Sequence, residues 1–229
     1  MEVKRVSNFA ELHNVLERYK KPAHWVFRGQ SNKDWDLIPK AGRKEYNSIS
    51  DKSFFESWKR RAIEFSRVDY TSDWDWLALA QHHGLPTRLL DWSINPLVAT
   101  YFAVCNDEEC DAIVYAYLTM QYCDVKKILD PFDDFKHISK IKPSGITQRL
   151  TRQHGVFTVH NPPNKSMKDN IRNNEQLDFF IIDKSYRKQL LFDLSYYGIN
   201  SMTIFPDLDG LSQHVDWYMK NADYWIGDN

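Results

Sequence analysis

Several stretches of the chain place apolar side chains at the three- and four-residue intervals of an amphipathic helix. After Asn8, with Glu11 three residues further on, this spacing predicts an N-terminal helix over residues 8–20 that opens with a capping box. The sequence predicts further helices over residues 51–68, 74–83, 185–197 and 210–220. Gly84 follows the third helix, where glycine commonly adopts the left-handed conformation that ends a helix.

Short apolar runs bounded by turn residues predict the strands. The clearest is 112–118, AIVYAYL, and others are expected over residues 23–28, 156–160, 177–182 and 199–205. In the strand over residues 23–28, Gly29 is expected to break the strand directly after Arg28. Strands and helices alternate without βαβ regularity. The pattern therefore predicts an α+β fold, with a mixed or antiparallel central sheet flanked by helices.

Residues 74–103 join two apolar helices through a polar stretch that reads as an extended turn. The second helix begins at Asn95-Pro96, because Asn can cap a helix and Pro fits its first turn. The polar side chains around this turn are Gln81, His82, His83, Thr87, Arg88, Asp91 and Asn95. Polar groups this dense form either a binding site or a hydrogen-bonded structural corner, and the pattern leaves both open.

The charge of the whole chain does not indicate a binding partner, but the charge of one segment does. The 229 residues suit one large domain, and 30 basic against 31 acidic side chains give a net charge of −1 that selects no polyanion. However, the segment 136–172 is rich in Lys and Arg and holds a single acid, Asp169. Such a segment is either an anion-facing surface, for a nucleotide or RNA, or an ordinary solvated face.

Cysteine spacing and hydropathy exclude other classes of protein. Cys105, Cys110 and Cys123 lack the paired spacing of zinc or redox sites, so reduced thiols in a cytoplasmic protein are expected. The adjacent His82 and His83 point about 100° apart on a helix and cannot face one metal, so no metal is expected. No run of 18 apolar residues occurs, which predicts no membrane partner.

Arg28 is the first candidate for ligand chemistry. It stands beside Gly29, which allows a ligand close to the backbone, and its guanidinium can hold a phosphate or carboxylate with two hydrogen bonds. Alternatively, it pairs with an acid such as Asp91. The start of the helix at Asn95 offers free N–H groups that suit a phosphate. His82 at a helix end is either a hydrogen-bond donor and proton carrier or a packing residue.

Several blocks of sequence resemble one known family, the FRG domain. They are Trp25-Val-Phe-Arg-Gly-Gln30, Trp35-x-Leu-x-Pro39, Gln81-His-His-Gly-Leu-Pro-Thr-Arg-Leu-Leu-Asp-Trp-Ser-x-Asn-Pro96, Tyr101-Phe-Ala103, Gln153-x-Gly-x-Phe157 and Phe205-Pro-x-Leu-x-Gly210. The resemblance spans about 25–210 and implies one FRG domain over 1–229, with the helix 8–20 packed on it. His83 departs from the pattern, because many members carry an aromatic such as Tyr there.

The arrangement is also similar, more weakly, to ADP-ribosyltransferases. That resemblance implies NAD as substrate and matches Arg28 to the first-strand arginine, residues 87–103 to a second block and Glu175 to a late-strand glutamate. The catalytic residues implied are Arg28, His82 and Glu175. Those implied to bind NAD are Gly29, Gln30, Gln81, His83, Thr87, Arg88, Asp91, Asn95 and Gln153. Were Glu175 remote from Arg28, then Asp91, Asp207 or Asp209 would have to supply the carboxylate.

The expected function is therefore an NAD-using ADP-ribosyltransferase or NAD glycohydrolase-like enzyme, acting as a toxin or an anti-phage effector. Its ligand would be a nucleotide, and RNA or protein could be the acceptor through segment 136–172. Two alternatives stay open: an RNA-binding or RNA-processing module that uses the same basic segment, and a non-catalytic interaction domain. The sequence does not predict an oligomeric state.

Overall fold

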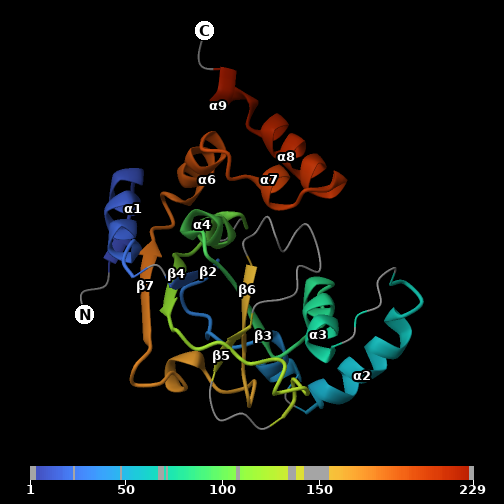
Figure 1. Cartoon of the computed structure of the whole chain (residues 1–229). Coiled ribbons are helices and arrows are strands. Elements are labelled where there is room, and N and C mark those ends of the chain that lie inside the picture. Colours follow the sequence, from blue (N-terminus) through green and yellow to red (C-terminus); the bar gives the residue numbers. More distant parts are fainter. Residues whose placement is uncertain are drawn as a thin grey trace.

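A seven-stranded mixed sheet forms the centre of the protein (Figure 1). The computed structural model describes residues 4–22, 24–46, 48–66, 70, 72–106, 109–133, 138–141 and 155–226. The strands are β1 (Lys4–Val6), β2 (Trp25–Gln30), β3 (Leu89–Ser93), β4 (Ala112–Leu118), β5 (Ser139–Ile141), β6 (Gly155–Val159) and β7 (Gln176–Ile182). Their spatial order is β1-β7-β4-β2-β3-β6-β5, with β1 parallel to β7 and the other neighbours antiparallel. The predicted α+β class is confirmed.

Side-chain caps begin most of the helices. The helices are α1 (Phe9–Leu16), α2 (Asp51–Ala62), α3 (Asp73–His82), α4 (Pro96–Val104), α6 (Arg187–Tyr196), α7 (Ser201–Ile204), α8 (Leu208–Lys220) and α9 (Ala222–Ile226). Short 3-10 turns are η1 (Glu17–Tyr19), η2 (Lys40–Gly42), η3 (Lys44–Tyr46) and η4 (Met167–Asp169). Asn8, Ser72, Asn95 and Asp207 accept backbone N–H bonds at the starts of α1, α3, α4 and α8.

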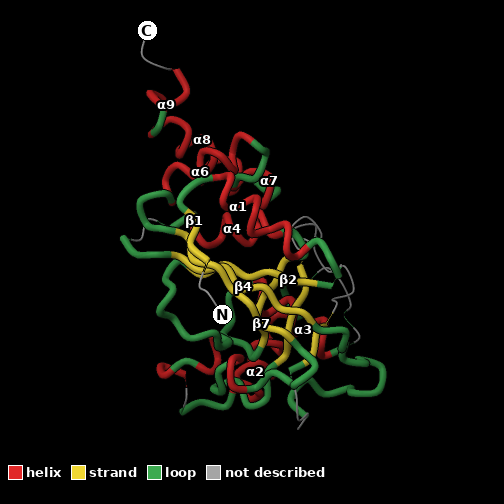
Figure 2. The backbone as a smooth tube through the Cα atoms, turned by 90° about the vertical axis from the view of Figure 1, so that its left-hand side faces the viewer, coloured by secondary structure: helices red, strands yellow, loops and turns green. Residues whose placement is uncertain are grey.

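The two faces of the sheet are covered differently. Helices α1, α4 and α6 pack on one face around Phe27, Val114 and Phe180, and Figure 2 shows these helices above the twisted sheet. Helices α2 and α3 cover the β3–β6 end of that face, against Leu89 and Phe157. The other face is covered by loop segments, whose buried residues include Leu37 and Met167 packed against Val26, Trp92 and Tyr115.

The sheet is split between β2 and β3. Strand β2 pairs with β4 along its full length, whereas with β3 it shares a single register pair, Phe27 with Ser93. Continuing that register would place Gly29 opposite Asp91, but no pairing occurs there. The two strands therefore diverge beyond Phe27 and leave room between them for side chains.

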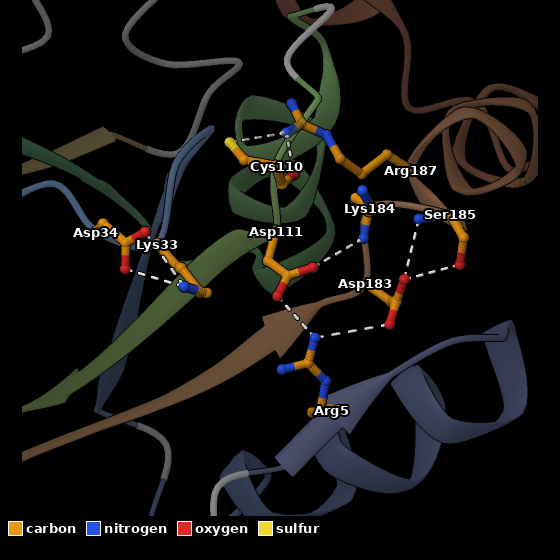
Figure 3. Close-up of polar contacts among 9 residues, drawn as sticks. All are labelled: Arg5, Lys33, Asp34, Cys110, Asp111, Asp183, Lys184, Ser185 and Arg187. Carbon is orange, nitrogen blue, oxygen red and sulfur yellow. Dashed lines mark hydrogen bonds and ion pairs between the residues drawn. The ribbon is translucent and has the colours of Figure 1, made fainter.

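A polar cluster ties the first strand to the centre of the sheet (Figure 3). Arg5 on β1 donates a 2.6 Å hydrogen bond to Asp111, which precedes β4, and lies 3.6 Å from Asp183, which follows β7. Nearby, the buried Arg187 of α6 donates to the backbone carbonyls of Ser31, Asn106 and Cys110 at 2.8 Å each. This arginine fixes the chain directly after β2 to the chain directly after α4.

Three predictions of local structure were wrong. The polar turn after Pro86 contains strand β3, because alternate side chains of Leu89–Ser93 pack on opposite faces of the sheet. Strand β2 does not break at Gly29 but continues to Gln30, paired with β4. The strand expected over 199–205 is the short helix α7, since Asn200 and Thr203 form a capping box that outweighs the β-branched composition.

Candidate functional site

A pocket of about 380 Å³ lies where β2 and β3 diverge. Its walls come from five parts of the fold: the end of β2, the second half of β3, the start of β6, the last turn of α3 and the loop between β2 and α2. Helix α4 closes the remaining side. The polar and aromatic side chains that line it include Arg28, Gln30, Trp35, Arg43, Gln81, His82, Asp91 and Phe102. The pocket therefore combines two guanidinium groups, one carboxylate and aromatic walls.

Arg28 fills part of the gap between the two strands. Its side chain is 18% exposed, and Nη1 donates a 2.8 Å hydrogen bond to the backbone carbonyl of Asp91, a residue that forms no ladder pair with β2. The same nitrogen lies 3.8 Å from the Asp91 carboxylate. Burial lowers the pKa of Arg28, Asp91 opposes this effect, and the nearby charge of Arg43 lowers it further. Arginine nonetheless stays charged in proteins, so the pocket holds a largely desolvated cation.

Asp91 is held in place by a chain of side-chain hydrogen bonds. Its carboxylate is 54% exposed and accepts a 2.7 Å bond from Gln81 Nε2. Gln81 Oε1 accepts from the hydroxyl of Thr87, which itself accepts the Leu89 N–H at 3.1 Å. Thr87 is buried, so this chain ties the pocket carboxylate to the start of β3. A carboxylate with one face fixed and the other open can meet a positively charged group on a ligand.

Gly29 allows α4 to approach the sheet. A Cβ atom at this position would lie 2.0 Å from the Ala99 carbonyl oxygen and 2.6 Å from the Ala103 nitrogen, both in the backbone of α4. The glycine of the Phe-Arg-Gly block is therefore required by helix–strand packing. Because Arg28 precedes it and Phe102 lies on the same helix, this contact also sets the width of the pocket.

A buried histidine lies close to Arg28. His160 is fully buried, and its Nε2 lies 2.9 Å from the hydroxyl of Thr158, which also accepts a 2.9 Å bond from the Trp92 indole. Burial lowers the pKa of His160 to about 3, and the charge of Arg28 contributes to this shift. The imidazole is therefore neutral at physiological pH. Sequence reasoning did not single out His160, because it reads as the polar end of a strand.

The loop between β2 and α2 brings two further residues to the pocket. Trp35 is 47% exposed and Arg43 is exposed, and both line the pocket wall. The loop is anchored by hydrogen bonds from Met167 N to Leu37 O at 3.0 Å and from Ala41 N to Thr87 O at 3.1 Å. Neither residue was among the predicted site residues, although Trp35 belongs to a family block.

The structure brings together six of the predicted site residues. Arg28, Gly29, Gln30, Gln81, His82 and Asp91 all line the pocket. Gln30 is buried and donates weakly to the Asp36 carbonyl at 3.4 Å. His82 lies at the end of α3, beside Gln81. Thr87 reaches the pocket only through Gln81.

Arg88 is engaged elsewhere. It is 6% exposed, forms a bidentate ion pair with Asp51 at 2.8 and 2.9 Å, and lies 4.5 Å from the centre of the Phe132 ring. A buried arginine held this way fixes α2 to the start of β3. The implied contact of Arg88 with NAD is not supported by this placement.

The structure also places two other predicted residues, Glu175 and His83, outside the pocket. Glu175 is buried before β7, accepts bonds from Thr119 and the Arg172 N–H at 2.9 Å each, and does not line the pocket. Its backbone lies two strands from β2, at a distance of roughly 15 Å from Arg28 by strand geometry. His83 lines a groove beside α2 instead.

Asn95 serves as the cap of α4 rather than as a wall of the pocket. Its side chain accepts the Leu97 N–H at 2.9 Å. The N-terminus of α4 lines a different groove, next to α1, so it does not share an anion with Arg28. Gln153 and much of segment 136–172 lie outside the described residues. Lys140, a described part of that segment, is buried with its ammonium 4.7 Å from the Tyr122 ring centre.

Neither a metal-ligand cluster nor a membrane-spanning helix occurs within the described ranges. Among these residues, no group of three or more His, Cys, Asp or Glu side chains is arranged to hold a metal ion. None of the helices described here combines the length and apolar character needed to cross a bilayer.

The fold and pocket together define an α+β domain with a basic, aromatic-lined pocket at a split in its sheet. Residues 23–112 match the family model of the FRG domain. The match includes the β2–β3 split, Arg28 and the whole of α4. The extension of the family to residue 210 stays a prediction. No curated protein and no solved structure matches the chain.

Proposed function

We propose that the chain binds NAD in the pocket around Arg28 and cleaves its nicotinamide–ribose bond, as an ADP-ribosyltransferase or NAD glycohydrolase. The observation that carries the proposal is the convergence of Arg28, Arg43 and Asp91 with aromatic walls in one pocket of 380 Å³. Two cations suit a pyrophosphate, and aromatic side chains suit a planar ring. The volume is within the range of small-molecule sites.

The two arginines would hold the diphosphate. Arg28 is partly desolvated and already positioned by its bond to the Asp91 carbonyl, so little conformational entropy is lost when it binds an anion. Arg43 is exposed and close enough to lower the pKa of Arg28 through its charge. An anion placed between them would relieve this repulsion. Both features favour a ligand with at least two negative charges.

Asp91 would take the role first expected of Glu175. Cleavage breaks the bond between the ribose carbon and the nicotinamide nitrogen, nicotinamide leaves with the electron pair, and positive charge develops on the sugar. A carboxylate fixed by Gln81 and open on its other side stabilises that charge. Water or an acceptor nucleophile then attacks the sugar carbon. His82, beside Gln81 on the pocket wall, would contact the ribose hydroxyls.

The test is nicotinamide release from NAD by the purified chain, with and without RNA or protein acceptors, measured by chromatography. We expect release, and a rise of the unfolding temperature with NAD. Arg28→Ala and Asp91→Asn should both abolish release, while Arg60→Ala, an exposed arginine outside the pocket, should leave it unchanged. Absence of both release and an NAD-induced thermal shift would refute the proposal. A thermal shift with pyrophosphate alone would limit the pocket to anion binding.

The second candidate function is RNA binding through segment 136–172, favoured by its excess of basic residues over the single acid Asp169. It predicts RNA affinity that falls steeply with salt and is lost when Arg149 and Arg152 become Ala. Equal mobility of RNA with and without protein at low salt would exclude this function. Lys140 contributes little, because its side chain is buried.

A further inference from the structure

Aromatic rings from three helices line a small pocket at the surface of the fold. Its volume is about 250 Å³, and the six rings, which together form the aromatic cage, are Phe9, Phe192, Tyr196, Tyr197, Tyr224 and Trp225. They come from the start of α1, the end of α6 and α9, and α6 lies between the other two helices in Figure 1 and Figure 2. The cage shares no lining residue with the Arg28 pocket, so it is a separate site.

The rings of the cage meet in both stacked and perpendicular pairs. Phe9 stacks on Tyr197, with 5.0 Å between the ring centres and 20° between the ring planes. Tyr196 is turned 85° from Tyr197, and Trp225 is turned 86° from Tyr224. The face of an aromatic ring is the negative side of its quadrupole, and rings at right angles present such faces from more than one direction. Walls of this kind attract a cation.

One carboxylate also lines the cage, and its charge has no cationic partner. Asp193 precedes Tyr196 by three residues and Tyr197 by four, so the three side chains share one face of the α6 end. The Asp193 oxygens accept hydrogen bonds from the hydroxyl of Tyr186 at 2.6 Å and from the amide of Gln189 at 3.0 Å, which are neutral donors. In the described part of the chain, no Lys, Arg or His side chain forms an ion pair with this carboxylate, and no Lys or Arg lies over a ring of the cage.

The charge of the surrounding sequence is negative as well. Residues 193–226 contain five aspartates and one lysine, Lys220, which lies 2.7 Å from an aspartate of its own helix. On α6, the exposed Lys188 stands five residues before Asp193, which places it about 140° away around the helix. On α1, His13 lies 3.3 Å from a carboxylate of the following turn. A cation in the cage would therefore meet Asp193 without competition from these bases.

The walls of the cage favour a methylated ammonium over a primary one. A primary ammonium is strongly hydrated and needs several acceptors to replace its water, whereas the cage offers one carboxylate and ring hydroxyls. A trimethylammonium group carries no N–H, spreads its charge over its methyl groups and packs these against ring faces. The volume lies below the usual range for a whole ligand, so the cage suits a single group of this kind.

We propose that the aromatic cage binds a trimethylammonium group, with Asp193 as its counter-charge. Tyr196 is 79% exposed and Tyr197 is 59% exposed, so the group reaches the rings directly from solvent. It is carried either by a small molecule of the choline type or by a trimethyllysine side chain, because the chemistry at the cage is the same for both. The proposal does not depend on NAD binding at Arg28, since the two sites share no residue.

The first test is an NMR titration of the full chain with choline and with 3,3-dimethyl-1-butanol, its uncharged analogue of the same shape. We expect choline to bind about fivefold or more tightly, because the ring faces and the carboxylate both act on its charge. Equal affinities, no binding of choline, or tighter binding of guanidinium than of choline would each overturn the proposal. A short peptide with trimethyllysine, compared with the same peptide carrying lysine, identifies the source: preference for the methylated peptide over choline assigns a protein ligand, and the reverse assigns a small molecule.

Variants at Tyr196 separate the ring face from simple apolar contact. Tyr196→Phe keeps the ring and should bind choline like the parent chain, whereas Tyr196→Leu keeps only apolar surface and should bind it about two- to fivefold more weakly. Both variants should fold, because the position is exposed. Asp193→Asn should weaken choline and leave the uncharged analogue unchanged, with circular dichroism as the check of folding. If Tyr196→Leu binds choline as tightly as Tyr196→Phe, the cage does not act through its ring faces and the proposal is wrong.

Discussion

Replacement of Gly29 by Ala tests whether helix–strand contact sets the shape of the site. The added Cβ would lie 2.0 Å from the Ala99 carbonyl oxygen, about 1.4 Å closer than ordinary van der Waals contact begins. Both partners are backbone atoms, so the contact cannot be relieved by turning a side chain. Overpacking of a core typically costs about 1–3 kcal/mol, and a backbone obstacle places this variant near the upper end.

Gly84→Ala is the matched control, because it makes the same change in the unfolded chain. Gly84 has a φ of +85° and nothing within 4 Å of an added Cβ, so only left-handed backbone strain, about 1–2 kcal/mol, is expected. In urea titrations, Gly29→Ala should lose about 3 kcal/mol of unfolding free energy, or about 6–12 °C of unfolding temperature. It should also bind pyrophosphate more weakly than Gly84→Ala. A Gly29→Ala variant at least as stable as Gly84→Ala would refute the reasoning.

Three further predictions follow from buried polar groups. His160 has a pKa near 3 in the folded chain, so between pH 6.5 and 3 the unfolded chain binds a proton at this residue that the folded chain does not bind. The unfolding free energy should therefore fall as the pH is lowered through this window, by up to about 1.4 kcal/mol per pH unit. His160→Gln should reduce this slope in urea titrations at pH 7 and pH 5, and an unchanged slope contradicts the assignment. Asp51→Asn should cost about 3–5 kcal/mol of unfolding free energy by leaving buried Arg88 without its carboxylate, and the pair Asp51→Leu with Arg88→Met should recover part of this loss. Glu175→Gln should cost about 1–3 kcal/mol in thermal unfolding yet leave NAD cleavage unchanged, whereas a selective loss of cleavage would return the catalytic role to this residue.

Short-range sequence signals correctly predicted the features that depend on contacts within a few residues, such as helix ends. Asn8, Asn95-Pro96 and Gly84 marked helix ends correctly, because caps and left-handed glycines act within a few residues. Strand β4 was equally clear, since a run of seven apolar residues fits a strand buried on both faces. The strand β3 was missed because its pattern, LLDWS, carries an exposed Asp91 and follows a dense polar turn. Its extended conformation depends on pairing with β6, which lies more than 60 residues away.

The candidate site was also predicted only in part, because it too depends on contacts between distant parts of the chain. Gln81, His82 and Asp91 were singled out by their density near one turn and Arg28 by its place beside Gly29, and the structure places all four around the pocket. Arg88 belongs to the same turn but faces Asp51, because alternate residues of a strand point to opposite sides. The sequence contains no local signal for the contribution of Arg43, which reaches the pocket through the tertiary path of its loop.

The single register pair between Phe27 and Ser93 gives the sheet a seam, and the pocket lies on that seam. Arg28 belongs to one half of the sheet and Asp91 to the other, so a ligand that engages both residues fastens the two halves together. A bound ligand should therefore slow amide hydrogen exchange at the ends of β2 and β3, because it holds the two halves together. Exchange within β4 and β7 should stay the same. Residues along this seam can be substituted, which changes the ligand that the pocket accepts, without altering the packing of either half of the sheet.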